Sequence, residues 1–509
     1  MNHRKFIYSS LLIAAISGAC SKMEEKPYQL INTKTFYKTP ADAESAIIYA
    51  YANLPEVGYY SRGYYIVTEL PTENLTQKGD AGANNVELDN IAPTNTNADL
   101  DRIWRYIYRG ISRSNAVINN VPKIPGMSEA ARNQIVGEGY FLRALNYFNL
   151  VRLFGEVPVR TDNVAEDSDI PLAKSPLKDI YDLIIADLIE AEKLIAQNKI
   201  SEGRANKVAA QALLSKVYLH LASSKNYGSP KYDFVTSADD MYAKAKEYSG
   251  KVIFDQSAFG FTEKLVDIFS IEKYKAAGAV TEHIFDAAVD RSGDREGSFS
   301  KISSMFLPAD RAMTIRYDPS DPASPMINIG QGWNHFWTEA GFYNNGFEAN
   351  DKRKTDLIVS SYTNSGTTYN LNVNSTSRPF SRKFIDPDRI GDATSCNSPI
   401  IRYSDILLVY AEASGPTPEA YSAVKRIRNR AGLGDLAPNL SVADFRKAVI
   451  KERSYELAFE GNRLFDLRRT NSMNEVLVQQ YGKNTMNPQS AYFFPIPLRE
   501  LQTNPLMTP

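Results

Sequence analysis

Residues 331–337 read Gln-Gly-Trp-Asn-His-Phe-Trp and hold two of the three tryptophans of the chain. Aromatic rings can stack on the apolar C–H face of a sugar ring, and neighbouring amides can bind its hydroxyls. The surrounding stretch is rich in glycine, asparagine and serine, which favours loops, and loops often carry binding residues. We therefore predict a ligand-binding surface that includes Trp333, Asn334, Phe336, Trp337 and Tyr343. The alternative is that both tryptophans pack inside a small core of this region.

A second aromatic cluster lies near the N-terminus, where residues 59–65 read Tyr-Tyr-Ser-Arg-Gly-Tyr-Tyr. Tyrosines at this density could form a rim that binds the hydroxyls of a ligand, and we assign Tyr59, Tyr60 and Tyr64 to it. The alternative is that these tyrosines close the first pair of helices. Trp104 falls on the apolar face of an amphipathic helix, which predicts a core residue.

Carboxylates could support catalysis, and a row of them occurs near the C-terminus. Glu452, Glu456 and Glu460 are spaced by four residues and share one face of a predicted helix, with several arginines nearby. A glycosidase needs two carboxylates that flank the scissile bond, which a single row does not provide. We predict a structural ion-pair network there and no catalytic residues. A secreted glycoside hydrolase stays open as an alternative.

Metal and cofactor sites have little support in the sequence. Two cysteines and four histidines are too few for a disulfide framework or a histidine-rich metal site. Residues 386–391 resemble part of a calcium loop, but Ile390 and Asn397 stand at ligand positions. We predict no metal and keep calcium open. The residue pattern of 432–437 matches a dinucleotide-binding fingerprint. That fingerprint must follow a strand, whereas these residues follow a predicted helix, so we predict no cofactor.

The composition is that of a globular chain without a nucleic-acid surface. Its 509 residues are 43% hydrophobic and 23% charged, with a net charge of −1. Basic residues at 425–430 lack interleaved aromatics and are predicted to form a solvated helix face. The chain has 30 tyrosines and 23 phenylalanines. Because a buried hydroxyl needs a partner, so much tyrosine indicates a recognition surface.

The N-terminus has the pattern of a targeting segment. A short basic region, an apolar run and small residues over 1–19 are typical of a signal peptide, and the run is too short to span a membrane. Cys20 would become the first mature residue, as in a bacterial lipoprotein, although Ser17 replaces the usual large aliphatic residue. We predict lipidation at Cys20; a chance cysteine is the alternative. The mature chain is mildly acidic, which fits a neutral ligand better than a polyanion.

A mainly α scaffold must position these residues. Over 20–254, apolar residues repeat at spacings of three, four and seven, which predicts antiparallel helix pairs of a helical solenoid. Thr39-Pro40 and Ser175-Pro176 indicate two capped helix starts. Over 255–400 this periodicity fades and glycine, proline and asparagine increase, which predicts an inserted irregular, loop-rich lobe. Helices return in 401–509, and we predict them over 404–413, 418–431 and 441–459.

Several stretches, taken together and in order, resemble the SusD/RagB family of surface nutrient-binding lipoproteins. The joint order is specific, whereas any one stretch alone would be weak. The stretches are Glu138 to Pro158, Gly203 to Tyr218, Ile401 to Ala413, Glu452 to Arg469, Phe494 to Pro497, and Asn504-Pro505.

This resemblance implies a fold of tetratricopeptide-like helix pairs (an α–α superhelix) and no catalysis. It implies a lid on a SusC-like TonB-dependent transporter of the outer membrane, which captures oligosaccharides for import. Some relatives serve peptide transport, so the same role for peptides stays open. Residues 21–26 resemble the acidic signal that sends such lipoproteins to the cell exterior. A helical-repeat scaffold that binds only protein is a further alternative.

Overall fold

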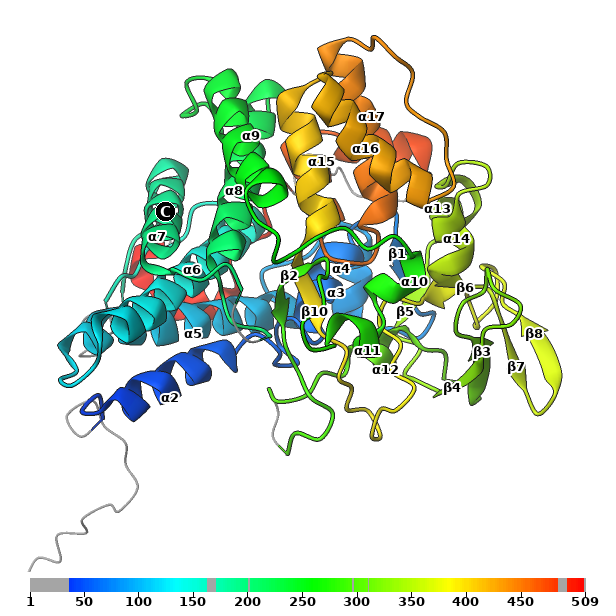
Figure 1. Ribbon diagram of the computed structural model, residues 1–509, viewed down its shortest axis with the longest axis horizontal. Helices are drawn as coiled ribbons and strands as arrows, with labels where there is room; N and C mark the ends of the chain where they lie inside the picture. Colours follow the sequence, from blue (N-terminus) through cyan, green and yellow to red (C-terminus); the bar gives the residue numbers. More distant parts are fainter. Residues whose placement is uncertain are drawn as a thin grey trace, which may run out of the picture.

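The computed structural model describes residues 36–162, 171–199, 202–294, 297–309, 311–483 and 492–507. The predicted signal peptide and Cys20 lie outside these ranges. Figure 1 shows helices on the left and at the top of the molecule, and short strands at its lower right. No helix in the described ranges is both long and apolar enough to span a membrane.

The N-terminal half is built from helices that pack against their sequence neighbours, α5 on α6, α6 on α7, α7 on α8, and α8 on α9. The first predicted cap is confirmed: the Thr39 side chain and Asp42 form a capping box at the start of α2. The second is wrong in detail, because Pro176 takes the N-cap position and no side chain caps that helix. The helices are α2 (Pro40–Tyr51), α3 (Gly63–Glu69), α4 (Ala83–Asp89), α5 (Ala98–Asn120), α6 (Glu129–Phe154), α7 (Leu177–Leu194), α8 (Lys207–Asn226) and α9 (Ala238–Phe254).

The middle of the chain contains short helices and short antiparallel strands. β1 (Leu75–Gln77) pairs with β5 (Phe336–Thr338), and β2 (His283–Ala287) pairs with β10 (Ser398–Arg402). A four-stranded sheet has the order β4 (Met326–Gly330), β3 (Met313–Arg316), β7 (Ser361–Asn364), β8 (Thr367–Asn370), and β6 (Ile358–Val359) pairs with β9 (Phe380–Ser381). The short helices are α10 (Leu265–Ile268), α11 (Ile271–Tyr274), α12 (Ile302–Phe306), α13 (Ala340–Asn345) and α14 (Lys352–Asp356).

Longer helices return in the C-terminal part, as predicted. The Ser441 side chain caps α17, which ends at Glu456, three residues before the predicted end. Phe459 has a φ of 67° and Gly461 a φ of 76°, a left-handed backbone that stops the helix. The elements are α15 (Tyr403–Ser414), α16 (Pro418–Arg430), α17 (Val442–Glu456), α18 (Arg463–Arg469), a π-helix (Asn474–Gln480) and α19 (Leu498–Thr503).

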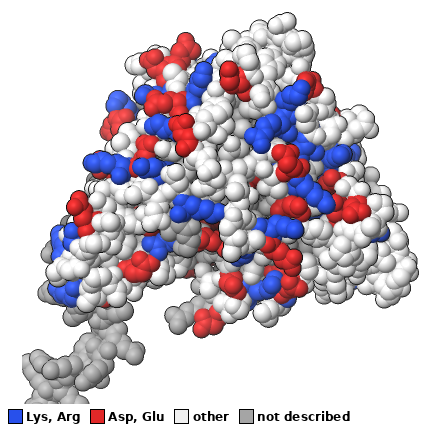
Figure 2. Space-filling model, in the orientation of Figure 1, with Lys and Arg blue, Asp and Glu red and all other residues white. Residues whose placement is uncertain are grey.

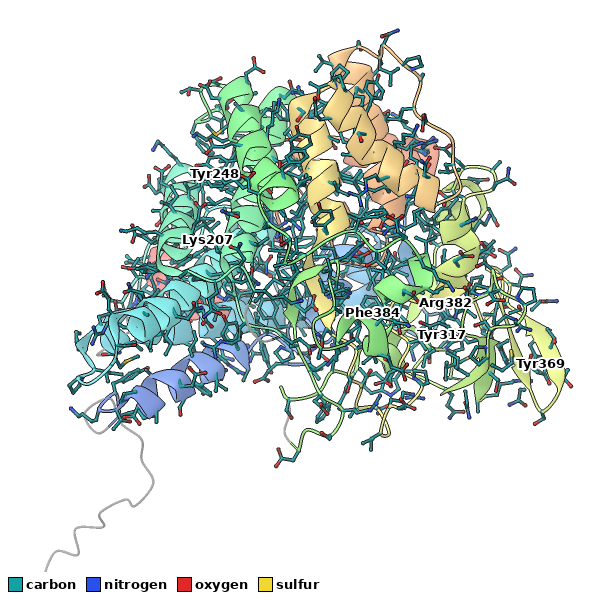
Figure 3. All side chains as sticks on the ribbon, viewed as in Figure 1. Lys207, Tyr248, Tyr317, Tyr369, Arg382 and Phe384 are labelled. Atoms are coloured by element: carbon teal, nitrogen blue, oxygen red, sulfur yellow. The ribbon has the colours of Figure 1, made fainter. Side chains whose placement is uncertain are left out.

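One continuous core joins both helical parts with β2 and α12, so the two parts form one body. Trp104 is 3% exposed within it, which confirms its prediction as a core residue. The four-stranded sheet has a small core of its own, closed by Arg382, which donates hydrogen bonds to the carbonyls of Arg316 and Tyr317 (Figure 3). The prediction of a mainly α fold with an inserted lobe is confirmed. The exact boundaries at 254 and 400 stay a prediction.

Glu452 and Glu456 on α17, together with Glu460 beyond its end, form the predicted ion-pair network, and their partners come from distant segments. The prediction that Glu460 shares the helix face is wrong, because the helix ends at Glu456. Glu452 binds Arg353 and Arg428, Glu456 binds Arg402 and Arg430, and Glu460 binds Lys383 and Arg402. The arginines next to this row in sequence pair elsewhere: Arg453 with Asp405, Arg463 with Glu73, and Arg469 with Glu412. Because these charges are buried, the pairing fixes the lobe and β10 against the C-terminal helices.

The prediction of a solvated basic face at 425–430 is wrong for half of its residues. Lys425 and Arg426 are exposed, but Arg428 and Arg430 are buried within the ion-pair network. The burial follows from position on α16, because residues 428 and 430 face α17 and the lobe. Elsewhere, Figure 2 shows basic and acidic side chains interspersed over the helices, and few charges over the sheet of β3, β7 and β8 at the right.

His283 on β2 is a buried histidine held between two hydrogen-bond acceptors. Its Nδ1 lies 2.9 Å from the Asp286 carboxylate and its Nε2 lies 2.8 Å from the Ile268 carbonyl. Burial alone lowers the pKa of His283, but the charge of Asp286 and these hydrogen bonds outweigh it and raise the pKa above 6.5. The imidazolium therefore stabilises the fold below the unfolded pKa, and this contribution is lost as pH rises through the folded pKa.

We expect His283→Gln to lower the free energy of unfolding more at about pH 5.5 than at about pH 9. His220→Gln is the matched control, because burial and then Arg152 hold the pKa of His220 well below 6.5. The loss of unfolding free energy caused by His220→Gln should be smaller at the lower pH. There the unfolded wild-type chain binds a proton at His220 and the folded chain does not, so the wild type is itself destabilised. Urea unfolding at both pH values measures the two deficits. Equal deficits for His283→Gln at both pH values would contradict a buried imidazolium.

Candidate functional site

A surface hollow of about 420 Å³ lies where three segments meet. The loop before α3 supplies Arg62, and helix α5 supplies Arg102 and Tyr106. The segment between β4 and β5 supplies Trp333. Its described lining residues are Val57, Gly58, Arg62, Arg102, Tyr106 and Trp333.

Trp333 projects outward because its backbone is held from behind. Its N–H donates to the Ser304 carbonyl at 2.6 Å, and the N–H of Asn334 donates to the Leu307 carbonyl at 2.8 Å. Asn334 has a φ of 52°, which turns the chain sharply after the tryptophan. With the backbone fastened to α12, the indole is left 36% exposed, and the Lys301 ammonium lies 5.7 Å from its ring centre. An exposed indole of this kind offers an aromatic face that a ligand could contact.

Tyr106 lies in the hollow because Gly58 leaves room for its ring. A Cβ atom at position 58 would lie 2.2 Å from the ring, so any larger residue would displace it. Tyr106 and Arg102 are four residues apart on α5 and therefore share one helix face. Sequence reasoning did not single out Tyr106. The available signal was an aromatic residue beside basic ones on the polar face of an amphipathic helix.

The charged groups of the hollow are two arginines that share one acid. Arg102 lies 2.8 Å and Arg62 lies 3.3 Å from the same oxygen of Asp99. Asp99 is buried at the start of α5, while both guanidinium groups retain exposed surface. His335 stays neutral beside them, because burial and then the charges of Arg62 and Lys78 lower its pKa to about 4. The hollow thus combines aromatic surface with fixed hydrogen-bond donors.

The residues predicted in the 331–343 segment do not form one site with Trp333. The Trp337 ring packs against the Arg378 guanidinium, and its Nε1 donates to Asn334 at 3.0 Å. Tyr343 on α13 lies beside Lys354 of α14. Neither lines the hollow. Phe336 is 2% exposed and packs in the core against Phe306, so its prediction as a ligand contact is wrong; an inward-facing position of β5 buries it.

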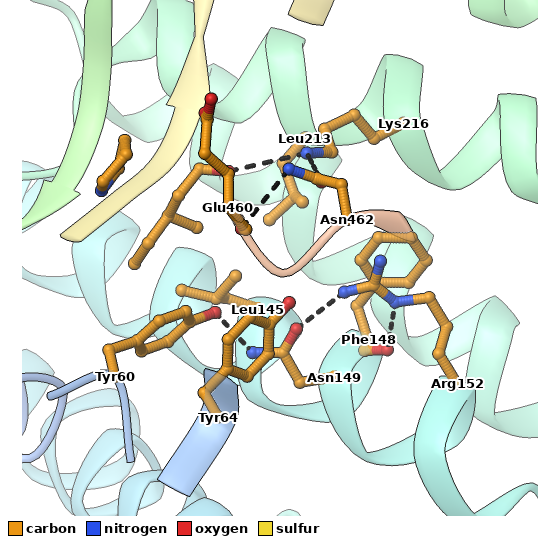
Figure 4. Close-up of a pocket in the computed structure, with 12 residues that line it drawn as sticks. Tyr60, Tyr64, Leu145, Phe148, Asn149, Arg152, Leu213, Lys216, Glu460 and Asn462 are labelled. Atoms are coloured by element: carbon orange, nitrogen blue, oxygen red, sulfur yellow. Dashed lines mark hydrogen bonds between the residues drawn. The ribbon is translucent and has the colours of Figure 1, made fainter. Parts of the chain in front are cut away.

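The predicted tyrosine rim is also wrong, because Tyr59, Tyr60 and Tyr64 are 0%, 2% and 6% exposed. Asn149 on α6 donates hydrogen bonds to the hydroxyls of Tyr59 and Tyr60 at 2.8 and 2.7 Å. The rings of Tyr60 and Tyr64 pack 4.4 Å apart around an internal cavity of about 10 Å³ (Figure 4). Such a cavity holds about one water molecule and no sugar. The tyrosines therefore pack inside the molecule, although their partners lie on α6 and near Gly461 and not within the first pair of helices.

Nothing in the described ranges assembles a metal centre of three or more histidine, cysteine or acidic side chains. At the segment that resembles a calcium loop, the Asp386 carboxylate accepts from Arg291, Thr394 and the Ser395 N–H. These donors occupy the oxygens that a cation would need. Cys396 is a buried free thiol, and burial raises its pKa to about 12, which makes it unreactive.

Two family models match the chain. The SusD family model matches residues 326–509, and a model described as "Starch-binding associating with outer membrane" matches residues 23–219. These two ranges together cover more than half of the chain. The chain is also similar to the SusD-like protein P2 of Formosa agariphila, at 28% identity over 100% of this chain and 99% of that protein.

Solved structures of this superfamily share the fold. A SusD superfamily protein from Parabacteroides distasonis has a TM-score of 0.75 at 22% identity, covering 92% of this chain and 98% of its own. Surface glycan-binding protein A from Bacteroides thetaiotaomicron, solved in complex with laminarihexaose, has a TM-score of 0.70 at 20% identity, covering 91% and 98%. With both family models and a full-length relative in agreement, the chain belongs to the SusD/RagB family.

Proposed function

We propose that this protein is a non-catalytic cell-surface lipoprotein that captures oligosaccharides and delivers them to a SusC-like TonB-dependent transporter. The observation that carries the proposal is the hollow in which exposed Trp333 lies beside Tyr106 and two arginines. An indole face supports the apolar face of a sugar ring, and guanidinium groups donate to its hydroxyls. The starch-binding family description and the laminarihexaose complex of the Bacteroides relative support the same ligand class.

A binding role without hydrolysis fits the chemistry of the hollow. None of the described residues that line it carries a carboxylate. Two acids that pair with arginines of this region, Asp99 and Glu56, are engaged by Arg102 and Arg109. A glycoside hydrolase needs one protonated and one ionised carboxyl group on either side of the bond. The described lining of the hollow supplies neither group.

The location follows from the N-terminal pattern. We propose that residues 1–19 are removed, that Cys20 carries the lipid, and that the protein faces the cell exterior from the outer membrane. Anchoring beside a transporter would raise the local concentration of ligand at its entrance. Metabolic labelling with a palmitate analogue in the native bacterium tests this, with Cys20→Ala as the comparison. Equal labelling of both chains would contradict lipidation at Cys20.

Isothermal titration of the chain without its signal peptide tests the ligand class. We expect heat of binding with at least one oligosaccharide family in a panel of neutral and acidic oligomers. We also expect no release of reducing sugar. Binding to peptides alone would favour the peptide-transport alternative. Release of reducing sugar that one Asp or Glu substitution abolishes would favour the hydrolase, and binding to protein alone would favour the scaffold.

A further inference from the structure

The hollow carries more positive than negative charge, in contrast to the chain as a whole. Among the described residues, Asp99 and Glu56 are the ion-pair partners of Arg62, Arg102 and Arg109. Lys301, beside the Trp333 ring, forms no ion pair with any described residue. Counted over these six described residues, the formal excess beside the aromatic surface is two positive charges, whereas the whole chain has a net charge of −1.

From this juxtaposition we infer that the hollow takes an acidic oligosaccharide, one that carries carboxylate or sulfate groups. The inference rests on the proposed function and specifies its substrate class. It replaces the expectation of a neutral ligand, which came from net charge alone. A cleft with local charge of one sign attracts the opposite sign whatever the total charge of the protein.

The two arginines are placed to bind such a group. Asp99 uses one oxygen for both Arg62 and Arg102, so each guanidinium retains donors that Asp99 does not use. The side chain of Arg102 is 37% exposed and that of Asp99 is 6% exposed, so the cation faces the hollow and the acid lies behind it. A planar guanidinium binds a carboxylate or sulfate through two parallel hydrogen bonds.

The electrostatic state of Arg62 agrees with this arrangement. Burial lowers the pKa of Arg62, Asp99 raises it, and the neighbouring charge of Arg102 lowers it again. Arginine nevertheless stays protonated in proteins. A guanidinium that is partly removed from water and repelled by a second one gains stability when an anion binds. Lys301, whose ammonium lies 5.7 Å from the centre of the Trp333 ring, would supply a second anchor.

The test measures affinity for three families of matched length: oligomers of a uronic acid, oligomers of a sulfated galactan, and neutral laminarihexaose and maltohexaose. Titrations are made in about 20 mM and about 300 mM NaCl, since salt screens charge. We expect an acidic family to bind at least tenfold tighter than the neutral ones at low salt, with the advantage mostly lost at high salt. The preferred family distinguishes carboxylate from sulfate recognition.

Arg102→Gln is the informative variant, and Arg105→Gln is its matched control. Arg105 lies on the same helix and pairs with Asp101, but it does not line the hollow. We expect Arg102→Gln to weaken acidic oligomers at least fivefold more than neutral ones, and Arg105→Gln to change neither. Neutral oligomers that bind as tightly as acidic ones, through Trp333, would overturn the inference and leave the proposed function intact. Failure to bind any glycan would contradict both.

Discussion

Trp333→Ala should weaken oligosaccharide binding by roughly 30-fold or more, about 2 kcal/mol, while the fold stays intact. The indole is the largest exposed aromatic surface in the hollow, and it is held there by backbone hydrogen bonds to α12 that the substitution does not touch. Its removal takes away the stacking face and leaves the guanidinium groups as the remaining contacts. Isothermal titration with the best oligosaccharide of the panel measures the loss.

Trp337→Ala is the matched control for this prediction. It removes the same side chain from the same segment, but its indole packs against Arg378 outside the hollow. We expect a change in affinity of less than about threefold, because the substitution removes no contact of the proposed site. A larger loss from Trp337→Ala than from Trp333→Ala would place the ligand beside Trp337, outside the hollow. Unchanged oligosaccharide binding in both variants would place the ligand away from both tryptophans and contradict the proposed site.

Arg402→Ala should lower the free energy of unfolding by about 3–5 kcal/mol, the cost of breaking a buried ion pair. Arg402 binds Glu282 at 2.6 Å, Glu460 at 2.7 Å and Glu456 at 3.2 Å, and it is 2% exposed. Its removal leaves three buried carboxylates with fewer partners than they need. Burial raises the pKa of Glu282, but Arg430 and Arg402 together hold it well below 4.5, so the carboxylate remains charged in the folded protein.

Lys425→Ala supplies the comparison, because Lys425 pairs with Asp435 at the surface, where both side chains are 54% exposed. An exposed pair contributes about 0–1 kcal/mol, so this variant should be nearly as stable as the wild type. Chemical denaturation with the same probe measures both variants. A loss below about 1 kcal/mol for Arg402→Ala would show that the network does not fix the lobe to the C-terminal helices.

Much of the fold could be predicted from local patterns. The capping box at Thr39, the Ser441 cap and the shared helix face of Glu452 and Glu456 depend on residues a few positions apart, and the structure confirms them. The partners of those glutamates could not be predicted in this way. Arg353 and Lys383 lie far from α17 in sequence, and only the packed lobe brings them to it.

The candidate site could be predicted from the sequence only in part, and the reason is again distance along the chain. Trp333 was identified by its aromatic segment, but Tyr106 and Arg102 reach it from α5. The tyrosines at 59–64 were misassigned because their hydroxyl partners, Asn146 and Asn149, lie on α6. Nothing near the tyrosines in sequence distinguishes a hydroxyl that faces solvent from one that binds a buried amide.

A crystal structure with the tightest-binding oligosaccharide tests the central claim most directly. The account predicts a sugar ring stacked on Trp333 at about 4 Å, the distance of van der Waals contact. It also predicts that Arg62 or Arg102 donates to a hydroxyl or acidic group of the same ligand. A bound oligosaccharide that touches Trp337 or Tyr343 and makes no contact with Trp333 would contradict it.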